Sequence, residues 1–159
     1  MPHKLVNILE QEMVLYIELI SLLQEEKRLL SKRATDELHQ LAARIEGVAF
    51  KIKGMDGARS RVAGELAARY GLAGSLPASL SLSMVIGRVE EPWKGRLNEL
   101  RSRLLSLVGA IRELNRENSI VIGRGMENIK TAFLFLKELS TFETYQPSGM
   151  ASRSLSKGV

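Results

Sequence analysis

The sequence contains no cysteine, only two histidines, and aromatic residues make up only 5% of it. The lack of cysteine excludes disulfides, thiolate zinc sites and a cysteine nucleophile, and it fits a reducing compartment. No run of about 18 apolar residues free of charges occurs, so we expect no membrane-spanning helix. The opening residues "MPHKLVNILEQEM" carry acidic side chains too early for a signal peptide. These absences favour a cytoplasmic protein.

Patterns for catalysis and metal binding are also missing. A di-iron helical bundle needs two Glu-x-x-His helices, and the chain has only His3 and His39. A phosphorelay role for His39 would require a lysine and a glycine just after it, and "HQLAARIEG" has neither in place. Glu25 and Glu26 adjoin two basic residues, which indicates a salt-bridged helix surface rather than an acid/base couple. We predict no enzyme activity and no cofactor or metal; a phosphotransfer domain stays as an alternative.

The positive charge is concentrated in one segment. The net charge is +5, and residues 92–142 hold nine basic and five acidic side chains. Because acids alternate with the arginines, we interpret this segment as a solvated helix face rather than a phosphate-binding surface. Trp93 is the only tryptophan, and nucleic-acid binding would need stacking aromatics among the basic residues. We therefore predict no nucleic-acid partner.

Apolar residues recur at helical spacing along most of the chain. Residues 4–32 carry two adjacent apolar stripes, and a face that wide should contact more than one neighbouring helix. The second helix, with Thr35 or Asp36 as its cap and Gly71 after its end, has a heptad seam that only Arg59 interrupts. The seam comprises Leu38, Leu41, Ile45, Val48, Ile52, Met55, Arg59, Val62 and Leu66.

The outward face of this second helix is built largely from small residues. Its members are Ala43, Phe50, Gly57 and Gly64, with Gly47 and Gly54 nearby. Glycine inside a helix costs about 1 kcal/mol relative to alanine. The face therefore indicates either close approach by another chain or a soft helix.

The third long helix should begin after a loop over residues 73–92, which holds one short helix starting near Ser81 or Ser83. Pro92 suits its first turn. Its predicted seam is Trp93, Leu97, Leu100, Leu104, Leu107, Ile111, Leu114, Asn118 and Val121. After Asn118 the register shifts to Ile122, Met126, Ile129, Phe133 and Leu136, which is a stutter. Asn115 should lie beside the seam, solvated or bonded locally.

These patterns predict an all-α fold, an antiparallel hairpin of long helices extended to a three-helix, coiled-coil-like bundle. We divide the chain into a helical domain over residues 1–142 and a flexible C-terminal tail over residues 143–159. The tail is rich in serine and contains Pro147 and Gly149. We expect it to be mobile alone and ordered on binding.

Several short motifs resemble the FlgN family of flagellar type III export chaperones. They are "LLQEEKRLL" followed by Asp36 and a heptad helix with Arg59 in its later half, "NRENSIVI" with its paired asparagines, and "TYQPSG" near the end. Their order spans nearly the whole chain. The sequence departs from the family in lacking a clear lysine in the middle of the second helix, where Arg44 or Lys51 stands in.

The resemblance implies a cytoplasmic chaperone that binds the helical C-terminal segments of hook–filament junction proteins. It would keep them unassembled and deliver them to a membrane export-gate component, with the export ATPase as a further candidate partner. The implied cargo-binding residues are Asn118, Ile122, Met126, Ile129, Phe133 and Leu136. Tyr145 is the candidate for docking to the export gate.

Two questions stay open at this point. The cargo-contact residues could equally pack against the chain's own first two helices, and Tyr145 could be a plain tail residue. A self-associating structural coiled coil is the main alternative function, and the sequence fits a monomer or a homodimer. Self-association would use the heptads themselves.

Overall fold

The structure, a computed structural model, describes residues 1–72, 82–118 and 135–136. Three long helices dominate it: α1 (Pro2–Lys32), α2 (Thr35–Arg69) and α4 (Trp93–Glu117). A short helix, α3 (Leu82–Ile86), precedes α4. The described segments contain no strand, so the predicted all-α bundle is confirmed. The predicted tail, residues 143–159, lies outside the described residues.

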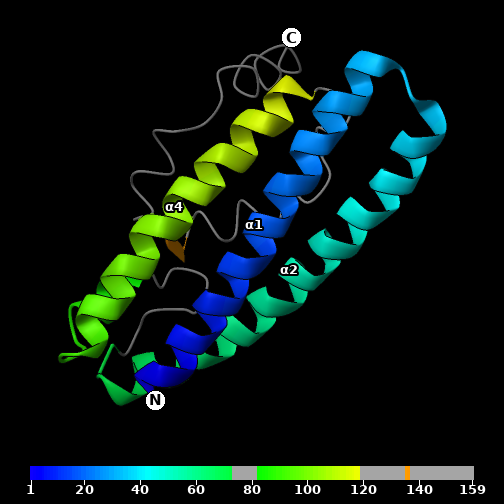
Figure 1. The fold of residues 1–159 in the computed structure, drawn as a ribbon. Coiled ribbons are helices and arrows are strands. Elements are labelled where there is room, and N and C mark those ends of the chain that lie inside the picture. The colour runs from blue at the N-terminus through cyan, green and yellow to red at the C-terminus, as the bar shows by residue number, and fades with distance from the viewer. Residues whose placement is uncertain (73–81, 119–134, 137–159) are drawn as a thin grey trace, which may run out of the picture.

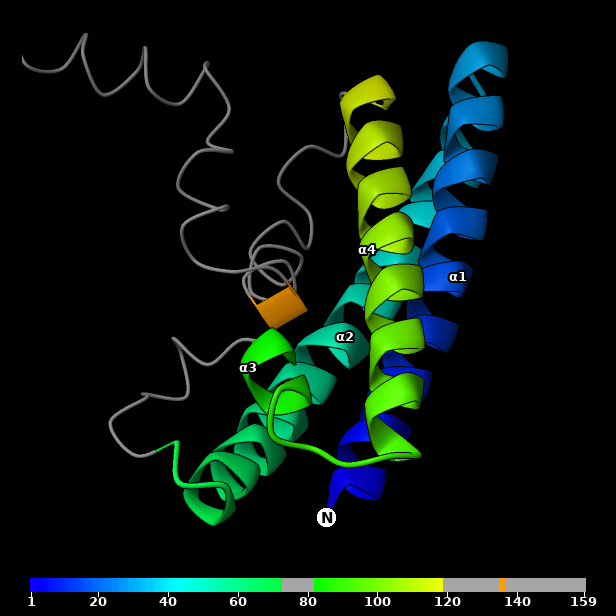
Figure 2. The same cartoon turned by 90° about the vertical axis from the view of Figure 1, so that its left-hand side faces the viewer.

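The helix α1 is the centre of the bundle. In Figure 1, α2 runs antiparallel to α1 on one side and α4 runs in the same direction as α1 on the other. Within the described segments α2 and α4 make no close backbone contact with each other. The short α3 contacts both and lies between them, as Figure 2 shows. Because α1 packs against both long helices, the wide apolar face predicted for it is confirmed.

The turn between α1 and α2 depends on a residue in the left-handed region. Arg33 ends α1 with φ 56° and ψ 33°, and the N–H of Ala34 donates to the carbonyl of Leu29. Neither Thr35 nor Asp36 caps α2 as predicted: Ala34 holds the N-cap position, and no side-chain hydrogen bond caps the helix. The chain reverses so tightly that α2 begins two residues after Arg33.

The end of α2 follows the prediction. Gly71 takes φ 67°, which glycine adopts without steric cost, and the N–H of Leu72 donates to the carbonyl of Ala67 at 2.9 Å. This is the hydrogen bond of a Schellman motif. It satisfies one of the carbonyls that a helix end leaves unpaired.

The core of the hairpin contains charged residues at seam positions. Along α1 the buried positions follow the four–three spacing of a heptad through Leu5, Leu9, Glu12, Tyr16, Leu19, Leu23 and Glu26. The prediction that Glu26 belongs to the helix surface is therefore wrong. Along α2 most of the predicted seam is confirmed, including the buried Arg59, although Leu38 and Met55 are only partly buried.

The seam predicted for α4 is wrong at two positions of its second half, Leu107 and Leu114, while Ile111 and Asn118 are buried as predicted. Val108 and Asn115 are buried, whereas Leu107 and Leu114 lie beside them and are only partly buried. Trp93 is 37% exposed and does not belong to the seam. Leu107 and Val108 are adjacent and both apolar, so periodicity alone fits either register, and the packing against α1 decides between them. Asn115 is buried instead of solvated.

The helix α4 stops where the sequence predicted that it would continue. It ends at Glu117, and Asn118 leaves the helical region with φ −90° and ψ 62°. The predicted stutter and the residues Val121, Ile122, Met126, Ile129 and Phe133 lie outside the described residues. At its other end Pro92 is the N-cap, one residue before the first turn that we predicted for it.

Candidate functional site

The middle of the bundle holds a group of charged side chains, the Arg59 cluster, consisting of the buried Glu12 and Arg59 and the partly exposed Asp56. Glu12 comes from α1 and the other two from α2. The guanidinium of Arg59 forms ion pairs with both carboxylates, and the Arg59 and Glu12 side chains are 3% and 2% exposed. Burying an ion pair costs hydration that the attraction between the partners repays only in part, and removing one partner leaves an uncompensated charge. The cluster therefore fixes the register of α1 against α2.

Burial dominates the protonation of the groups around Arg59. It raises the pKa of Glu12 to about 7, with Arg59 opposing the shift by attraction. The pKa of Tyr16 is also raised, first by burial and then by the negative charge of Glu12. The hydroxyl of Tyr16 is buried and has no hydrogen-bond partner among the described residues. The two side chains share one helix face because they stand four residues apart.

Phe135 and Leu136 close the bundle over this cluster. The guanidinium carbon of Arg59 lies 4.8 Å from the centroid of the Phe135 ring, in a cation–π arrangement. The Nε–H of Arg101, on α4, donates to the backbone carbonyl of Leu136 at 2.9 Å. Both residues are buried and belong to the same apolar core as α1, α2 and α4. One short stretch of chain thus contacts an arginine from each of the two outer long helices.

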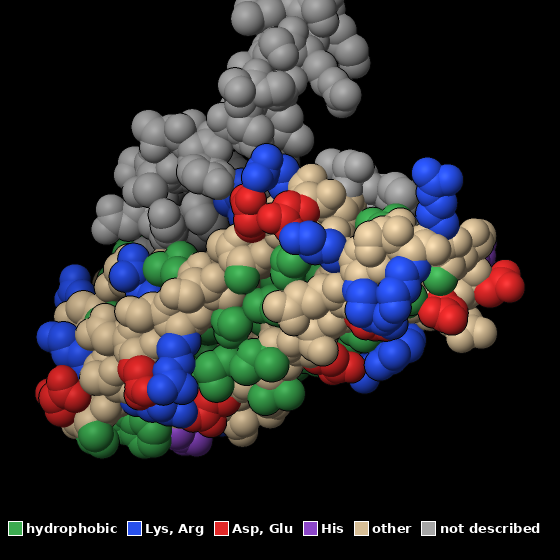
Figure 3. Space-filling model, turned by 45° about the horizontal axis from the view of Figure 1, so that its top comes forward, with side chains coloured by type: hydrophobic (Ala, Val, Ile, Leu, Met, Phe, Trp, Pro, Cys, Tyr) green, Lys and Arg blue, Asp and Glu red, His purple; other side chains and the backbone are tan. Residues whose placement is uncertain are grey.

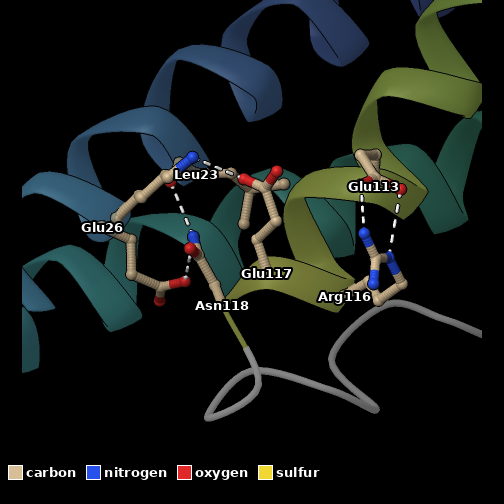
Figure 4. Close-up of polar contacts among 7 residues, drawn as sticks. Leu23, Glu26, Glu113, Arg116, Glu117 and Asn118 are labelled. Atoms are coloured by element: carbon tan, nitrogen blue, oxygen red, sulfur yellow. Dashed lines mark hydrogen bonds and ion pairs between the residues drawn. The ribbon is translucent and has the colours of Figure 1, made fainter.

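Asn118 ties the end of α4 to α1, as the close-up in Figure 4 shows. Its side-chain amide donates to the carbonyl of Leu23 at 2.8 Å and to the carboxylate of Glu26 at 3.2 Å. Its backbone N–H donates to the carbonyl of Leu114 at 2.8 Å. The ammonium of Lys27, on α1, lies 2.6 Å from the carboxylate of Glu117, the last residue of α4. The amide therefore anchors the end of α4 to α1.

A second anchor lies at the opposite end of α4. Arg96 bonds one carboxylate oxygen of Glu10 on α1 through two nitrogens, at 2.5 and 3.1 Å, and pairs with Glu99 on its own helix. Arg103 and Arg116 also pair with acids of α4. Figure 3 shows basic and acidic side chains interspersed over the face it presents, with hydrophobic side chains grouped between them. These pairs agree with the interpretation of the α4 arginines as a solvated, salt-bridged face.

Two of the predicted cargo-binding residues lie within the described part of the chain, and both pack inside the bundle. Asn118 and Leu136 are each 1% exposed, Asn118 at the end of α4 and Leu136 beside Arg101. The remaining predicted site residues, Ile122, Met126, Ile129, Phe133 and Tyr145, lie outside the described residues. His39 is exposed on α2, with its Nδ1 3.3 Å from the carbonyl of Thr35.

The charged partners of Arg59 were not predicted from the sequence. The signal was available, because acidic residues occupy two seam positions of α1, Glu12 and Glu26, fourteen residues apart. Glu12 and Arg59 also stand at similar chain distances from the turn between α1 and α2. In an antiparallel hairpin such residues meet, so an acid in one seam and an arginine in the other predict a buried pair. The interaction of Arg59 with Phe135 had no comparable signal.

Comparison with known proteins assigns the family. The fold and the buried contacts define a bundle of long helices in which the described residues offer no group of His, Asp or Glu side chains that could hold a metal. Nor is any helix of the described segments long and apolar enough to cross a bilayer. The family model described as FlgN protein matches residues 1–153, so the chain belongs to the FlgN family, a family of flagellar export chaperones. No curated protein and no solved structure matches the chain.

Proposed function

We propose that this chain is a cytoplasmic export chaperone that binds the C-terminal helices of hook–filament junction proteins. It keeps them unassembled and delivers them to the membrane export gate, acting by stoichiometric binding without catalysis. A junction protein outside its assembly exposes an amphipathic helix, and a helical bundle can cover that apolar face. Family membership over residues 1–153 is the observation that carries this proposal.

The architecture supports this proposal. The two outer helices α2 and α4 flank α1 without close backbone contact with each other. Among the described residues, α3 contacts both outer helices, and the pair Phe135–Leu136 contacts Arg59 of α2 and Arg101 of α4. A partner helix could complete such a bundle by the packing that joins α1 to α2 and α4.

The proposed cargo-binding residues are those after the end of α4, namely Ile122, Met126, Ile129, Phe133 and Leu136. Asn118 would contribute indirectly. It follows the last residue of α4 and is bonded to α1, so it would set the direction in which the next residues leave the helix. Methionine adapts readily to different apolar partners, which suits Met126 to this role. Tyr145 is the proposed contact with the export gate.

The test uses isothermal titration calorimetry of the full-length protein with a C-terminal fragment of a junction protein. Phe133→Ala should weaken binding about tenfold, because truncating a buried aromatic at an interface removes a major contact. Val14→Ser is the matched control, since Val14 is 61% exposed on α1 and should leave the affinity unchanged. Equal affinities of Phe133→Ala and wild type would argue against this surface.

Gate docking is tested separately from cargo binding. Tyr145→Ala should keep the affinity for the junction-protein fragment and lose binding to the export-gate component. Surface plasmon resonance with the immobilised soluble part of that component measures the loss. Retained gate binding by Tyr145→Ala would remove this residue from the proposal.

A further inference from the structure

We propose that the place occupied by Phe135 and Leu136 is a recognition site for the end of a partner's amphipathic helix, and that these two residues compete for it in the free protein. The partner end would carry an aromatic side chain, an adjacent aliphatic one and a free backbone carbonyl or carboxylate. The inference rests on the proposed function, because the partner is the exported cargo.

The first observation is the state of Arg59. This guanidinium is 2% exposed, its charge is balanced by Glu12 and Asp56, and its face is covered by the ring of Phe135. A guanidinium shielded from water is stabilised by an aromatic ring stacked on its face, whichever chain supplies that ring. The site therefore selects an aromatic residue and does not require that it be Phe135.

The second observation is the contact of Arg101. It donates to a main-chain carbonyl, that of Leu136, and not to a side chain. The last turn of any helix leaves carbonyl groups without partners, and a C-terminal carboxylate offers the same geometry with more charge. Arg101 can therefore bind the end of a partner helix as well as it binds Leu136.

The third observation is where the site lies. Arg59 belongs to α2 and Arg101 to α4, two helices that make no close backbone contact with each other in the described segments. The site thus lies where a buried guanidinium of α2 and a guanidinium of α4 meet two adjacent residues, Phe135 and Leu136.

Competition in the free protein has a definite consequence for affinity. When a binding-competent state is only partly populated, the apparent dissociation constant rises by the inverse of that fraction. Leu136, which we proposed as a cargo contact, is buried against the bundle, so cargo must displace it before contacting it. Weakening the internal contact should therefore tighten binding in trans.

The first arm of the test needs no cargo. A synthetic peptide of residues 128–142 is titrated onto the full-length double variant Phe135→Ala/Leu136→Ala, which removes the aromatic ring and the aliphatic side chain from the site and keeps the backbone carbonyl that Arg101 binds. We expect saturable binding, weakened at least tenfold when Arg101→Gln is added. Absence of binding to the double variant would overturn the inference, and circular dichroism confirms that the variant keeps its helices.

The second arm follows displacement in the otherwise unaltered chain, which has no cysteine. The single variant Leu136→Cys should react slowly with iodoacetamide, and a saturating junction-protein fragment should speed the reaction about tenfold or more. Ser102→Cys, on the exposed face of α4 beside Arg101, is the control and should not change. An unchanged or slower reaction of Leu136→Cys while calorimetry shows fragment binding would overturn the inference.

The two arms separate this inference from the proposed function. Failure of every junction-protein fragment to bind, with the peptide still bound by the double variant, rejects the cargo and keeps the site. Binding of the fragment with equal affinity for wild type and the single variant Phe135→Ala, which changes no proposed cargo contact, keeps the cargo and rejects competition. Should the double variant lose its helices, the Leu136→Cys arm decides alone.

Discussion

At the scale of single residues, the bundle is organised by polar groups placed inside an apolar seam. Glu12, Arg59 and Asn118 are each at most 2% exposed, and each meets its partner on another helix. Aliphatic side chains at the same positions would pack in several registers. A buried polar group is satisfied in only one, at some cost in stability. These residues thus specify the alignment of the helices.

The protonation of Glu12 makes stability depend on pH. Its pKa is about 7 in the folded protein against 4.5 for an ordinary glutamate carboxyl, so the folded state binds the proton more tightly. Its contribution is fully present below pH 4.5 and is lost as the pH rises to about 7. Urea unfolding at about pH 5 and about pH 7.5 should show this loss, at most about 3 kcal/mol.

The control for this prediction is Glu12→Gln, which cannot ionise. Its stability should change less between the two pH values than that of the wild type. Equal pH dependence in the two proteins would show that Glu12 keeps an ordinary pKa in the folded state.

Replacing the amide of Asn118 with a carboxylate should lower the stability of the protein. Asn118→Ala removes its two side-chain hydrogen bonds and should cost about 1–2 kcal/mol. Asn118→Asp should cost more, because a second carboxylate would then face Glu26. Denaturant unfolding at neutral pH measures both, and Glu26→Gln should recover part of the loss in Asn118→Asp. A smaller loss for the aspartate than for the alanine variant would contradict the geometry.

At the scale of helices, the sequence predicted the parts governed by local patterns. The end of α1, Gly71 after the end of α2, the short α3 and most of the seam of α2 agree with the structure. The prediction from the sequence failed where a contact with another helix decides which side chains are buried. The register of α4 depends on α1, since the adjacent residues Leu107 and Val108 suit either choice.

The same limit applies to the candidate site. Arg59 stood out as an interruption of the seam, but its contact with Phe135 joins residues far apart in the sequence. Asn118 was placed on the seam correctly, whereas the end of α4 at Glu117 was not foreseen, because the apolar pattern continues beyond it. Periodicity records which face is apolar and does not record where a helix stops.

The outer face of α2 offers a prediction at the helix scale. A Cβ atom added at Gly47, Gly54 or Gly57 would meet nothing within 4 Å. Alanine at each position should therefore stabilise the free protein by about 1 kcal/mol through helix propensity alone. Thermal unfolding of the single variants measures this gain.

The small side chains of this face would let another copy of the chain approach closely. Analytical ultracentrifugation of Gly54→Ala and Phe50→Ala, beside the wild type, shows whether another copy packs on it. Phe50 is 77% exposed, so its removal should leave a monomer unchanged. A wild-type dimer lost in either variant would favour the alternative of a self-associating coiled coil.

At the scale of the whole molecule, the chain is a FlgN-family protein in which α1 supports two long helices that make no close backbone contact with each other in the described segments. Two residues, Phe135 and Leu136, contact both outer helices, through an aromatic ring over the guanidinium of Arg59 and a backbone carbonyl bonded to the guanidinium of Arg101. Under our proposal, a helix of the cargo would replace these two contacts.

The measurement that tests the central claim most directly is calorimetric titration of the full-length protein with the C-terminal fragment of a junction protein. A fragment of the same length from a flagellar protein outside the junction serves as the control. The account predicts saturable one-to-one binding of the junction fragment, with a dissociation constant on the order of micromolar, as expected for an interface that must later be released. No binding of the junction fragment up to about 100 micromolar, or equal binding of the control, would contradict it.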